Sequence, residues 1–296
     1  MHILITGGRG QLGTELTKCL KTGKTALGTV PELLEDCSVT SIDFEELDIT
    51  DRVSIDNYFS SEQIDCVINC AAMTNVDGCE TKKDDAFAVN ALGCRNLAIA
   101  CEREGAELIS ISSDYVFSGE RKNGKPYREY DVCNPKSVYG RSKLLGEQYI
   151  RDFCSKWYII RTSWLYGEVG NNFVKTIRRV GAENGKLSVV NDQIGNPTNA
   201  ADLAHHILKL IGTREYGIYH CTGEGECSWF DFAKKIIELS KINCTVTPCT
   251  SSEYPSSVKR PAYSSLENMA LRLSVGNEMR SWQEALTEYI PIIDKQ

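Results

Sequence analysis

Tyr139 and Lys143 stand four residues apart in the segment Tyr139-Gly-Arg-Ser-Lys143. In a helix this spacing puts a phenol and an ammonium group side by side on one face. The ordinary pKa of tyrosine, about 10, makes it a reluctant proton donor near neutrality, but a nearby cation stabilises the phenolate and lowers that pKa. The pair could therefore protonate an oxygen. Pairs of solvated residues on helix surfaces show the same spacing, so other residues of the chain must show whether this pair is catalytic.

A hydroxyl group precedes this pair in the chain. Ser112 and Ser113 follow the apolar run 108–111, and open α/β sheets place their ligands at the carboxyl ends of such strands. A carbonyl that receives hydride needs a hydroxyl donor to polarise its oxygen and an acid to protonate it. Ser113 and Tyr139 meet these two needs, although a serine at this place also serves to start a turn.

A glycine-rich turn follows the first apolar run, Ile3-Leu-Ile5. Glycines at positions 7, 10 and 13 of such a turn let backbone N–H groups approach a pyrophosphate at a helix N-terminus. The turn predicts a dinucleotide site, although its spacing differs from G-x-G-x-x-G, and tight packing or flavin binding are alternatives. The residues expected to contact the cofactor here are Gly7, Arg9, Gly10, Gln11, Leu12 and Gly13.

Two residues give opposite indications about the dinucleotide. Asp43, at the end of the second expected strand, could accept the adenosine ribose hydroxyls and favours NAD, whereas Arg9 could attract the extra phosphate of NADP. Asp43 comes later in the chain than is usual, because residues 22–37 look like an inserted loop. Asp48 and Ile49 are expected to lie near the adenine, at the entry to the next helix.

The next strand ends in small residues, in Asn69-Cys-Ala-Ala72. Ala71 and Ala72 would allow a cofactor ribose to lie against the backbone, and the alternative is that they serve only sheet packing. Together with Lys143, which could hold the nicotinamide ribose, they complete the expected cofactor site. The glycine turn, the Ser112-Ser113 segment and the Tyr139/Lys143 pair follow one another along the chain, and this order suggests nicotinamide-dependent carbonyl chemistry.

Short apolar runs alternate with helical stretches along the chain, which predicts an α/β fold of the Rossmann type with a doubly wound parallel sheet. The expected strands are residues 3–5, 39–43, 66–70, 108–112, 157–162, 187–190 and 217–220. We expect a dinucleotide-binding domain at 1–165 and a smaller lobe, mainly for substrate binding, at 166–296. The elements near 187–220 belong either to that lobe or to the sheet.

Composition excludes several classes of protein. The 296 residues include 42% hydrophobic and 25% charged ones, as in an ordinary globular protein without a membrane span. A net charge of −7 argues against a nucleic-acid partner, and the 13 cysteines lack metal-ligand spacing and are interpreted as reduced. We expect a cytoplasmic protein, because the first strand begins near His2 without a leader.

Several segments make the chain resemble the extended short-chain dehydrogenase/reductases and, within them, the dTDP-4-dehydrorhamnose reductase family. The segments are 7–13, 69–72, 112–117, 134–147, 161–166, 171–173, 191–198 and Arg260-Pro261. Members of this family reduce the C4 ketone of dTDP-4-dehydro-L-rhamnose with NADPH or NADH to make dTDP-L-rhamnose for bacterial surface polysaccharides. The resemblance implies the same fold and activity here, and adds Thr74 and Asn90 to the cofactor site.

The resemblance also implies roles for single residues. Tyr139 becomes the acid, Lys143 its modulator and Ser113 the hydroxyl that contacts the reacting oxygen, where the family usually has threonine. The residues expected to contact the nucleotide sugar are Asp114, Tyr115, Trp164, Asn172 and Arg260. Trp164 could equally belong to the core, and Arg260 could equally be solvated.

Related functions remain as alternatives. A dehydratase needs a carboxylate where this chain has Tyr115, and a 3,5-epimerase needs two further acid/base groups. A non-catalytic relative, such as the regulatory β subunit of methionine adenosyltransferase, uses the fold for partner binding, although intact Ser113, Tyr139 and Lys143 count against it. Some relatives bind Mg²⁺ between subunits, so Mg²⁺ and a homodimer are further expectations that no residue here assigns.

Overall fold

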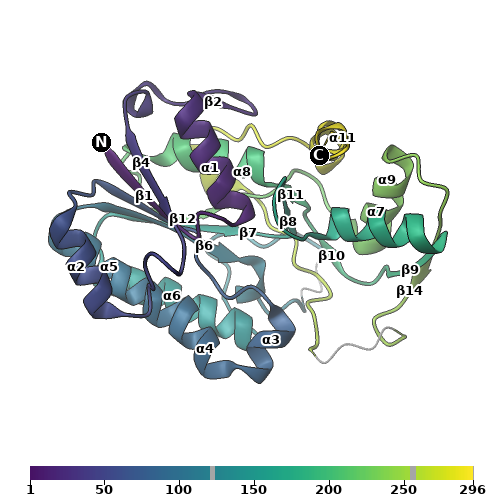
Figure 1. The fold of residues 1–296 in the computed structure, drawn as a ribbon. Coiled ribbons are helices and arrows are strands. Elements are labelled where there is room, and N and C mark those ends of the chain that lie inside the picture. Colours follow the sequence, from purple (N-terminus) through teal and green to yellow (C-terminus); the bar gives the residue numbers. More distant parts are fainter. Residues whose placement is uncertain (121–123, 254–257, 296) are drawn as a thin grey trace.

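The computed structural model describes residues 1–120, 124–253 and 258–295. Its centre is a six-stranded sheet whose neighbouring strands all run parallel, in the order β12-β7-β6-β5-β1-β4 (Figure 1). The strands are β1 (His2–Thr6), β4 (Ser38–Ile42), β5 (Cys66–Asn69), β6 (Glu107–Ser113), β7 (Trp157–Thr162) and β12 (Gly217–His220). Six of the apolar runs in the sequence therefore form this sheet.

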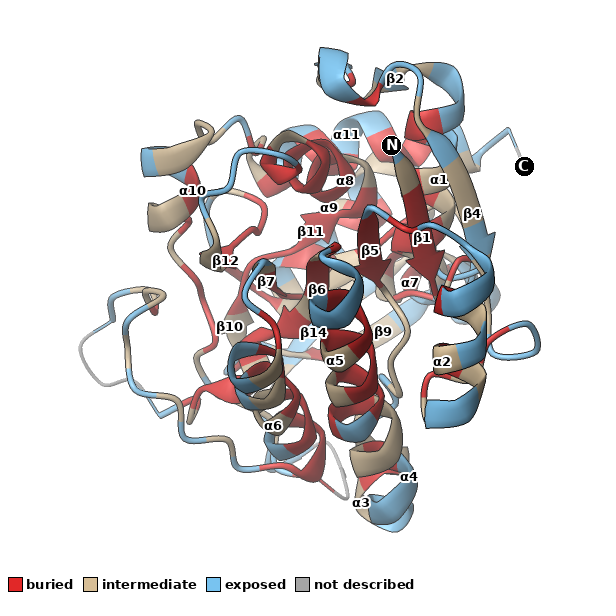
Figure 2. Ribbon diagram, turned by 90° about the vertical axis from the view of Figure 1, so that its left-hand side faces the viewer, coloured by how far each residue is buried: buried red, intermediate tan, exposed pale blue. Residues whose placement is uncertain are grey.

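Helices cover both faces of the sheet, as Figure 1 shows. On one face, α1 (Gln11–Thr22) and α8 (Ala200–Leu210) pack on alternate strand residues such as Ile3 and Ile5. On the other face, α2 (Arg52–Ser61), α5 (Cys94–Glu104) and α6 (Val138–Phe153) enclose Leu4 and its neighbours. The central strands are consequently buried on both sides (Figure 2), and the expected doubly wound α/β fold is confirmed.

The strand order changes direction beside β1. The chain passes from β1 to β4 on one side, and then returns to β5 on the other side of β1. In open α/β sheets such a switch point leaves a crevice outside the carboxyl ends of the strands, where ligands bind. The glycine turn follows β1 and the segment 70–72 follows β5, so both flank this crevice.

A second hydrophobic cluster lies beside the sheet. It contains α7 (Phe173–Asn184), α9 (Trp229–Leu239) and α11 (Trp282–Ile293), which share buried aromatic and aliphatic side chains. Short strand pairs complete this region: β9 (Lys186–Val190) with β14 (Thr245–Cys249), β8 (Leu165–Tyr166) with β11 (Thr198–Asn199), and β10 (Ile194–Gly195) with β13 (Cys227–Ser228). The run 187–190 thus pairs outside the central sheet, whereas 217–220 forms its edge strand.

Residues 22–37 are ordered against the sheet layer. They contain a small antiparallel pair, β2 (Lys24–Thr25) with β3 (Gly28–Thr29), and a 3₁₀ turn at Glu32–Leu34. Val30 and Leu34 are buried in the same core as α1 and α8. The segment expected to be an inserted loop is therefore a small hairpin that is anchored by apolar contacts.

Between β5 and α5 the chain forms α3 (Val76–Thr81), α4 (Lys83–Phe87) and a π-helical turn at Ala88–Gly93. A 3₁₀ turn at Asp114–Val116 follows β6, and α10 (Met269–Ser274) packs near the edge strand β12. Among the described residues, no helix is long and apolar enough to cross a bilayer.

Candidate active site

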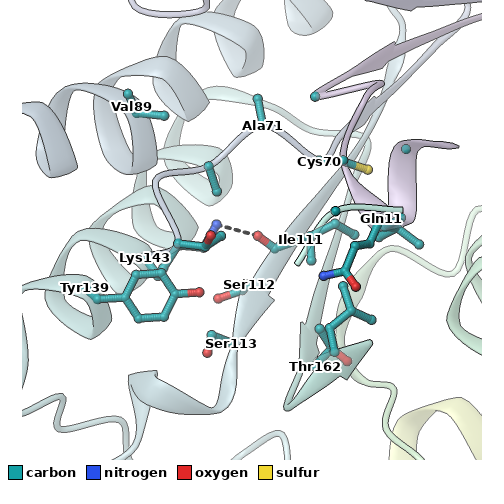
Figure 3. A pocket seen from close by; sticks show the side chains of 18 of the residues that line it. Gln11, Cys70, Ala71, Val89, Ile111, Ser112, Ser113, Tyr139, Lys143 and Thr162 are labelled. Atoms are coloured by element: carbon teal, nitrogen blue, oxygen red, sulfur yellow. Dashed lines mark hydrogen bonds between the residues drawn. The ribbon is translucent and has the colours of Figure 1, made fainter. Parts of the chain in front are cut away.

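A cavity of about 710 Å³ opens at the carboxyl ends of the central strands. Its wall brings together residues from the glycine turn, the ends of β4 to β7 and the start of α6 (Figure 3). Of the site residues expected from the sequence, it contains Gly7, Gly10, Gln11, Leu12, Gly13, Asp43, Asp48, Ile49, Ala71, Ala72, Thr74, Ser113, Asp114, Tyr115, Tyr139, Lys143 and Trp164. Residues more than 150 positions apart therefore share one site.

The glycine turn is shaped by close backbone contacts. Gly7 has a φ of +67°, and a Cβ atom on it would lie 2.7 Å from the backbone nitrogen of Ala71. A Cβ atom on Gly13 would lie 2.4 Å from the carbonyl oxygen of Gly7. These contacts draw α1, β1 and the segment after β5 together, which only glycine allows. The glycine turn therefore forms a cradle lined by backbone atoms, and side chains at Gly7 or Gly13 would collide with that backbone.

The N-terminus of α1 faces this cradle. Gly10 is the residue before the helix, and it has no side chain to cap the first N–H groups. Unpaired N–H groups at a helix start, together with the helix dipole, favour an anion such as a pyrophosphate. The turn therefore fits the diphosphate of a dinucleotide.

Arg9 is not among the residues that line the cavity. Its guanidinium contacts Glu45 and Glu46, and its backbone nitrogen donates a hydrogen bond to Oδ2 of Asp43 at 3.1 Å. Asp48 accepts hydrogen bonds from the backbone nitrogen and the hydroxyl of Thr50, both at 2.8 Å. Asp43 and Asp48 thus shape the turn after β4 as well as lining the cavity.

Tyr139 lies in the first turn of α6, close to the end of β6. The helix starts at Ser137, whose hydroxyl accepts a hydrogen bond from the backbone nitrogen of Gly140. A Cβ atom on Gly140 would lie 2.2 Å from the carbonyl oxygen of Tyr115, so glycine permits this helix to approach the 113–115 segment. The rings of Tyr115 and Tyr139 meet edge to face at 5.4 Å.

Tyr139, Lys143 and Ser113 point into the same part of the cavity, as Figure 3 shows. All three are buried, with exposures of 9%, 4% and 6%. Nζ of Lys143 donates a hydrogen bond of 2.6 Å to the carbonyl oxygen of Ile111, which fixes the ammonium group beside β6. The spacing of Tyr139 and Lys143 in the sequence therefore corresponds to a helix face that looks into the cavity.

The pKa of Tyr139 shifts in the direction opposite to the one expected from the sequence. Burial is the largest cause and raises this pKa, the charge of Asp114 raises it further, and a hydrogen bond with Ser113 lowers it. The pKa of Lys143 is lowered, again chiefly by burial, while Glu147 and two cysteine thiols oppose the shift. Without a bound ligand, the desolvation of the phenol outweighs the lysine that was expected to lower its pKa. Tyr139 is consequently a protonated phenol at neutral pH.

Ser113 connects Tyr139 to a buried carboxyl group. Its hydroxyl donates a hydrogen bond of 2.8 Å to Oδ1 of Asp114 and accepts one from the backbone nitrogen of Tyr115. Oδ2 of Asp114 is buried and has no hydrogen-bond partner among the described residues. Burial raises the pKa of Asp114 to about 6, against hydrogen bonds that lower it. A polar ligand group could therefore satisfy Asp114.

A buried ion pair holds the helix of Tyr139 against the sheet. Glu147, one further turn along α6 from Lys143, accepts hydrogen bonds from Nε and Nη2 of Arg161 on β7 at 2.9 and 2.7 Å. It also accepts a hydrogen bond of 2.5 Å from the hydroxyl of Ser112. Since Ser112 and Arg161 are paired across β6 and β7, this one carboxylate ties α6 to both strands.

Trp164 forms part of an aromatic stack at the cavity wall. Its ring lies parallel to that of Trp229 at the start of α9, with centroids 3.5 Å apart, and both rings line the cavity. Trp164 has a φ of +46°, a strained value for a tryptophan, and its ring packs against Gly195. Trp164 thus joins the sheet layer to the second cluster.

Three other expected residues lie outside the main cavity. Asn90 is buried in the π-helical turn and bonds to the backbone of Met73 and to Ser142, which fixes the segment after β5 against α6. Asn172 caps α7, and its amide donates a hydrogen bond of 3.0 Å to Oε1 of Gln11. Asn90 and Asn172 therefore support the wall from behind.

Arg260 lies in a smaller adjoining pocket of about 100 Å³. Tyr115 separates this pocket from the main cavity and lines both. Nη2 of Arg260 is 3.2 Å from a carboxylate oxygen of Asp77 on α3. Lys136 and Lys259 line the same pocket, where both pair with the carboxylate of Glu120, so the three cations of the lining outnumber its one carboxylate. The pocket is therefore a basic extension of the cavity.

Sequence reasoning missed some residues of the wall. Trp229 gave no signal because it lies far from every motif, at the start of an ordinary amphipathic helix. Thr162 was inside a quoted segment but was not singled out, although its buried hydroxyl lines the cavity and has no hydrogen-bond partner among the described residues. Phe44 also lines the cavity with an exposed ring, and its place directly after Asp43 in the sequence could have drawn attention to it.

Nothing in the described part of the chain assigns Mg²⁺. No group of three or more histidine, cysteine, aspartate or glutamate side chains in that part could hold a metal ion. The cysteines are all free thiols in the structure, and their reduced state in the cell stays a prediction. Mg²⁺ between subunits stays a prediction, because a single chain contains no such interface.

Comparison with known proteins places the chain among characterised relatives. The family model described as RmlD substrate binding domain matches residues 1–294. The spore coat polysaccharide biosynthesis protein SpsK of Bacillus subtilis (strain 168) is 41% identical over 288 residues, which are 97% of this chain and 96% of that protein.

Two solved structures are also similar over almost their whole length. A dTDP-4-dehydrorhamnose reductase of Clostridium acetobutylicum ATCC 824 is 46% identical with a TM-score of 0.93, covering 99% of this chain and 100% of that one. The dTDP-4-dehydrorhamnose reductase of Bacillus anthracis str. Ames, solved in complex with NADP, is 40% identical with a TM-score of 0.90, covering 98% and 99%. The chain therefore belongs to the dTDP-4-dehydrorhamnose reductase family, as its sequence motifs predicted.

Proposed function

We propose that this protein reduces the C4 ketone of dTDP-4-dehydro-L-rhamnose to dTDP-L-rhamnose with NADH or NADPH. The observation that carries the proposal is the convergence of Ser113, Tyr139 and Lys143 in the same cavity as the glycine cradle. Family membership supports the substrate, and the NADP bound to the Bacillus anthracis relative supports the type of cofactor. A ketoreductase acting on another nucleotide sugar would need the same three residues.

Each residue of the site has one task in the proposed reaction. A bound reduced nicotinamide supplies the hydride that forms the new C–H bond at C4. Tyr139, protonated at neutral pH because burial raises its pKa, transfers its phenolic proton to the ketone oxygen and completes the hydroxyl group. Ser113 polarises that oxygen, and the ammonium of Lys143 stabilises the negative charge that develops near the phenol. The remaining phenolate is reprotonated before the next turnover.

Tyr115 supports reduction rather than elimination. A dehydratase would need a base at this position to remove a proton from the carbon beside the ketone. Burial raises the pKa of Tyr115, so this phenol stays protonated and is a poor carbon base. We therefore assign Tyr115, with Asp114 and Trp164, to contacts with the sugar.

Arg260 is proposed to contact the diphosphate of the nucleotide sugar. A guanidinium binds phosphate oxygens through paired N–H donors, and the adjoining pocket adds Lys136 and Lys259, whose charge is partly neutralised by Glu120. Because Arg260 contacts Asp77, a bound diphosphate would compete with this carboxylate. The expected homodimer, Mg²⁺ and cytoplasmic location remain predictions that accompany this proposal.

The test is the loss of NAD(P)H absorbance with dTDP-4-dehydrorhamnose in wild type and Tyr139→Phe. Removal of the acid should lower kcat by about 10²- to 10⁴-fold with the fold unchanged. Tyr149→Phe, which alters a tyrosine of the same helix outside the cavity, should keep wild-type turnover. Undiminished turnover in Tyr139→Phe would refute the acid assignment, and no turnover in wild type would favour the non-catalytic, partner-binding alternative.

A further inference from the structure

The adenosine end of the cavity is built around one arginine and several carboxylates. The turn after β4 contacts the glycine turn through two hydrogen bonds, from the backbone nitrogen of Gly8 to the carbonyl oxygen of Ile42 and from that of Arg9 to Asp43. In dinucleotide-binding folds an acidic residue at the end of the second strand binds the ribose hydroxyls, whereas a nearby arginine accommodates the 2′-phosphate of NADP. Asp43 and Arg9 supply both residue types here, so the existing contacts of each side chain decide whether the site favours ribose hydroxyls or a 2′-phosphate.

Both arms of the Arg9 guanidinium are already engaged. Nη1 lies 2.8 Å from Oε2 of Glu45, and Nη2 lies 2.5 Å from Oε1 of Glu46. The other oxygen of Glu46 accepts a hydrogen bond of 3.0 Å from the backbone nitrogen of Asp43, which holds this glutamate in place. A 2′-phosphate could pair with Arg9 only by displacing one or both glutamates.

The charge balance of this turn also opposes a phosphate. Asp43, Glu45, Glu46 and Asp48 provide four carboxylates against the single guanidinium of Arg9 within residues 43–48 and the glycine turn. A phosphate monoester adds about −1.5 to −2 charges near neutral pH. The uncharged ribose hydroxyls of NADH avoid this repulsion, and Asp43 and Asp48 both line the cavity where they could accept from them.

We propose that Glu45 and Glu46 compete with the 2′-phosphate of NADPH for Arg9, and that this competition makes the protein prefer NADH over NADPH. The proposal rests on the proposed function, and it names the cofactor that the same site selects. The glutamates act as specificity-determining residues, because they change the cofactor that binds without touching the reacting atoms. Since the side chains of Arg9, Glu45 and Glu46 are exposed, solvent and salt screen the effect, and we expect a preference of no more than roughly tenfold.

Direct binding tests the proposal without the sugar substrate. NADH and NADPH are titrated into the protein, and the increase in their fluorescence gives the ratio of Kd for NADPH to Kd for NADH. Wild type should favour NADH, with a ratio of at most about 10. In Glu45→Gln/Glu46→Gln, Arg9 is released and two negative charges are lost, so Kd for NADPH should fall about tenfold while Kd for NADH changes less than twofold.

Two controls make the assignment specific. Glu183→Gln/Glu238→Gln removes two charges from other surface ion pairs, with Arg179 and Lys235, and should leave the ratio unchanged. Arg9→Gln in the Glu45→Gln/Glu46→Gln background should abolish the gain in NADPH affinity. A wild type that binds NADPH more tightly, or a ratio that does not change in Glu45→Gln/Glu46→Gln, overturns this inference alone. Binding of neither cofactor by wild type overturns the proposed function as well.

Discussion

The hydroxyl of Ser113 donates its hydrogen to Oδ1 of Asp114 at 2.8 Å. Because Ser113 also shares a hydrogen bond with Tyr139, the three side chains form a continuous polar chain at the end of β6. The carboxyl group at its end is 2% exposed and has one oxygen without a hydrogen-bond partner among the described residues. A buried carboxylate with an unpaired oxygen lowers the free energy of unfolding, and such a cost is often found where a residue serves a functional site.

Asp114→Asn should stabilise the protein above about pH 6. The pKa of Asp114 is about 6 in the folded protein and near 3.8 when exposed, so its contribution to stability is fully present below pH 3.8 and is lost as the pH rises through 6. Asparagine keeps the acceptor for Ser113 without the charge. We expect the free energy of unfolding at pH 8 to rise by about 1–3 kcal/mol, with a much smaller difference at pH 4.

Urea unfolding of both proteins at the two pH values measures this difference. Asp202→Asn is the matched control, because Asp202 is also buried but is paired with Arg280. That substitution should destabilise the protein at pH 8. A destabilised Asp114→Asn at pH 8 would mean that a partner satisfies the carboxylate in solution.

Glu147→Gln should change the pH dependence of turnover as well as stability. The substitution leaves Arg161 buried without a full countercharge, which typically costs about 3–5 kcal/mol. Glu147 also raises the pKa of Lys143 against the effect of burial. Without it, Lys143 should lose its proton at lower pH, so the alkaline limb of the kcat profile should move toward neutrality.

The comparison with Asp202→Asn separates the two effects of Glu147. Asp202→Asn breaks a buried ion pair of similar kind at a residue that does not line the cavity, and should lower stability without moving the pH profile. Glu147→Asp keeps a carboxylate near Lys143 and should therefore shift the pH profile of kcat less than Glu147→Gln does. If all three variants keep the wild-type profile, Glu147 contributes only to stability.

Gly7→Ala should weaken cofactor binding by more than tenfold, because it changes the shape of the glycine turn. The alanine methyl would lie 2.7 Å from the backbone of Ala71, and the φ of +67° adds about 1–2 kcal/mol for a residue with a Cβ atom. Gly23→Ala is the matched control, since Gly23 has a φ of +69° but no atom within 4 Å of such a methyl. Fluorescence titration should show a weakening of NADH binding by more than tenfold in Gly7→Ala and no change in Gly23→Ala. If Gly7→Ala and Gly23→Ala bound NADH with equal affinity, the close contact at Gly7 would not be required for cofactor binding.

Trp229→Ala should weaken binding of the nucleotide sugar more than binding of the cofactor. The substitution removes the stacking partner of Trp164, a contact of the kind worth about 0.5–1.5 kcal/mol, and lets its strained backbone relax. We expect KM for the sugar to rise about two- to tenfold, with Kd for NADH unchanged. Trp229→Phe keeps an aromatic face and should retain most of the affinity. A larger effect on NADH would place Trp229 at the cofactor instead.

The sheet, the glycine turn and the pair on α6 were predictable from the sequence alone. Strands such as β6 and β7 depend on local apolar runs, and Tyr139 and Lys143 share a face because helix geometry alone places residues four apart together. Gly7 and Gly13 were recognisable because glycine is required where backbones meet closely. These features depend on neighbours in the chain, which a sequence displays.

The side chains that reach the cavity, and their contacts there, depend on how distant elements pack and became visible only in the folded chain. Asn172 supports Gln11 across 161 positions, and Trp229 joins the wall through α9, so no local pattern could indicate either contact. The pairing of Arg9 with Glu45 and Glu46 and the raised pKa of Tyr139 likewise depend on the packing of separate elements, because burial and charge neighbours are properties of the folded chain.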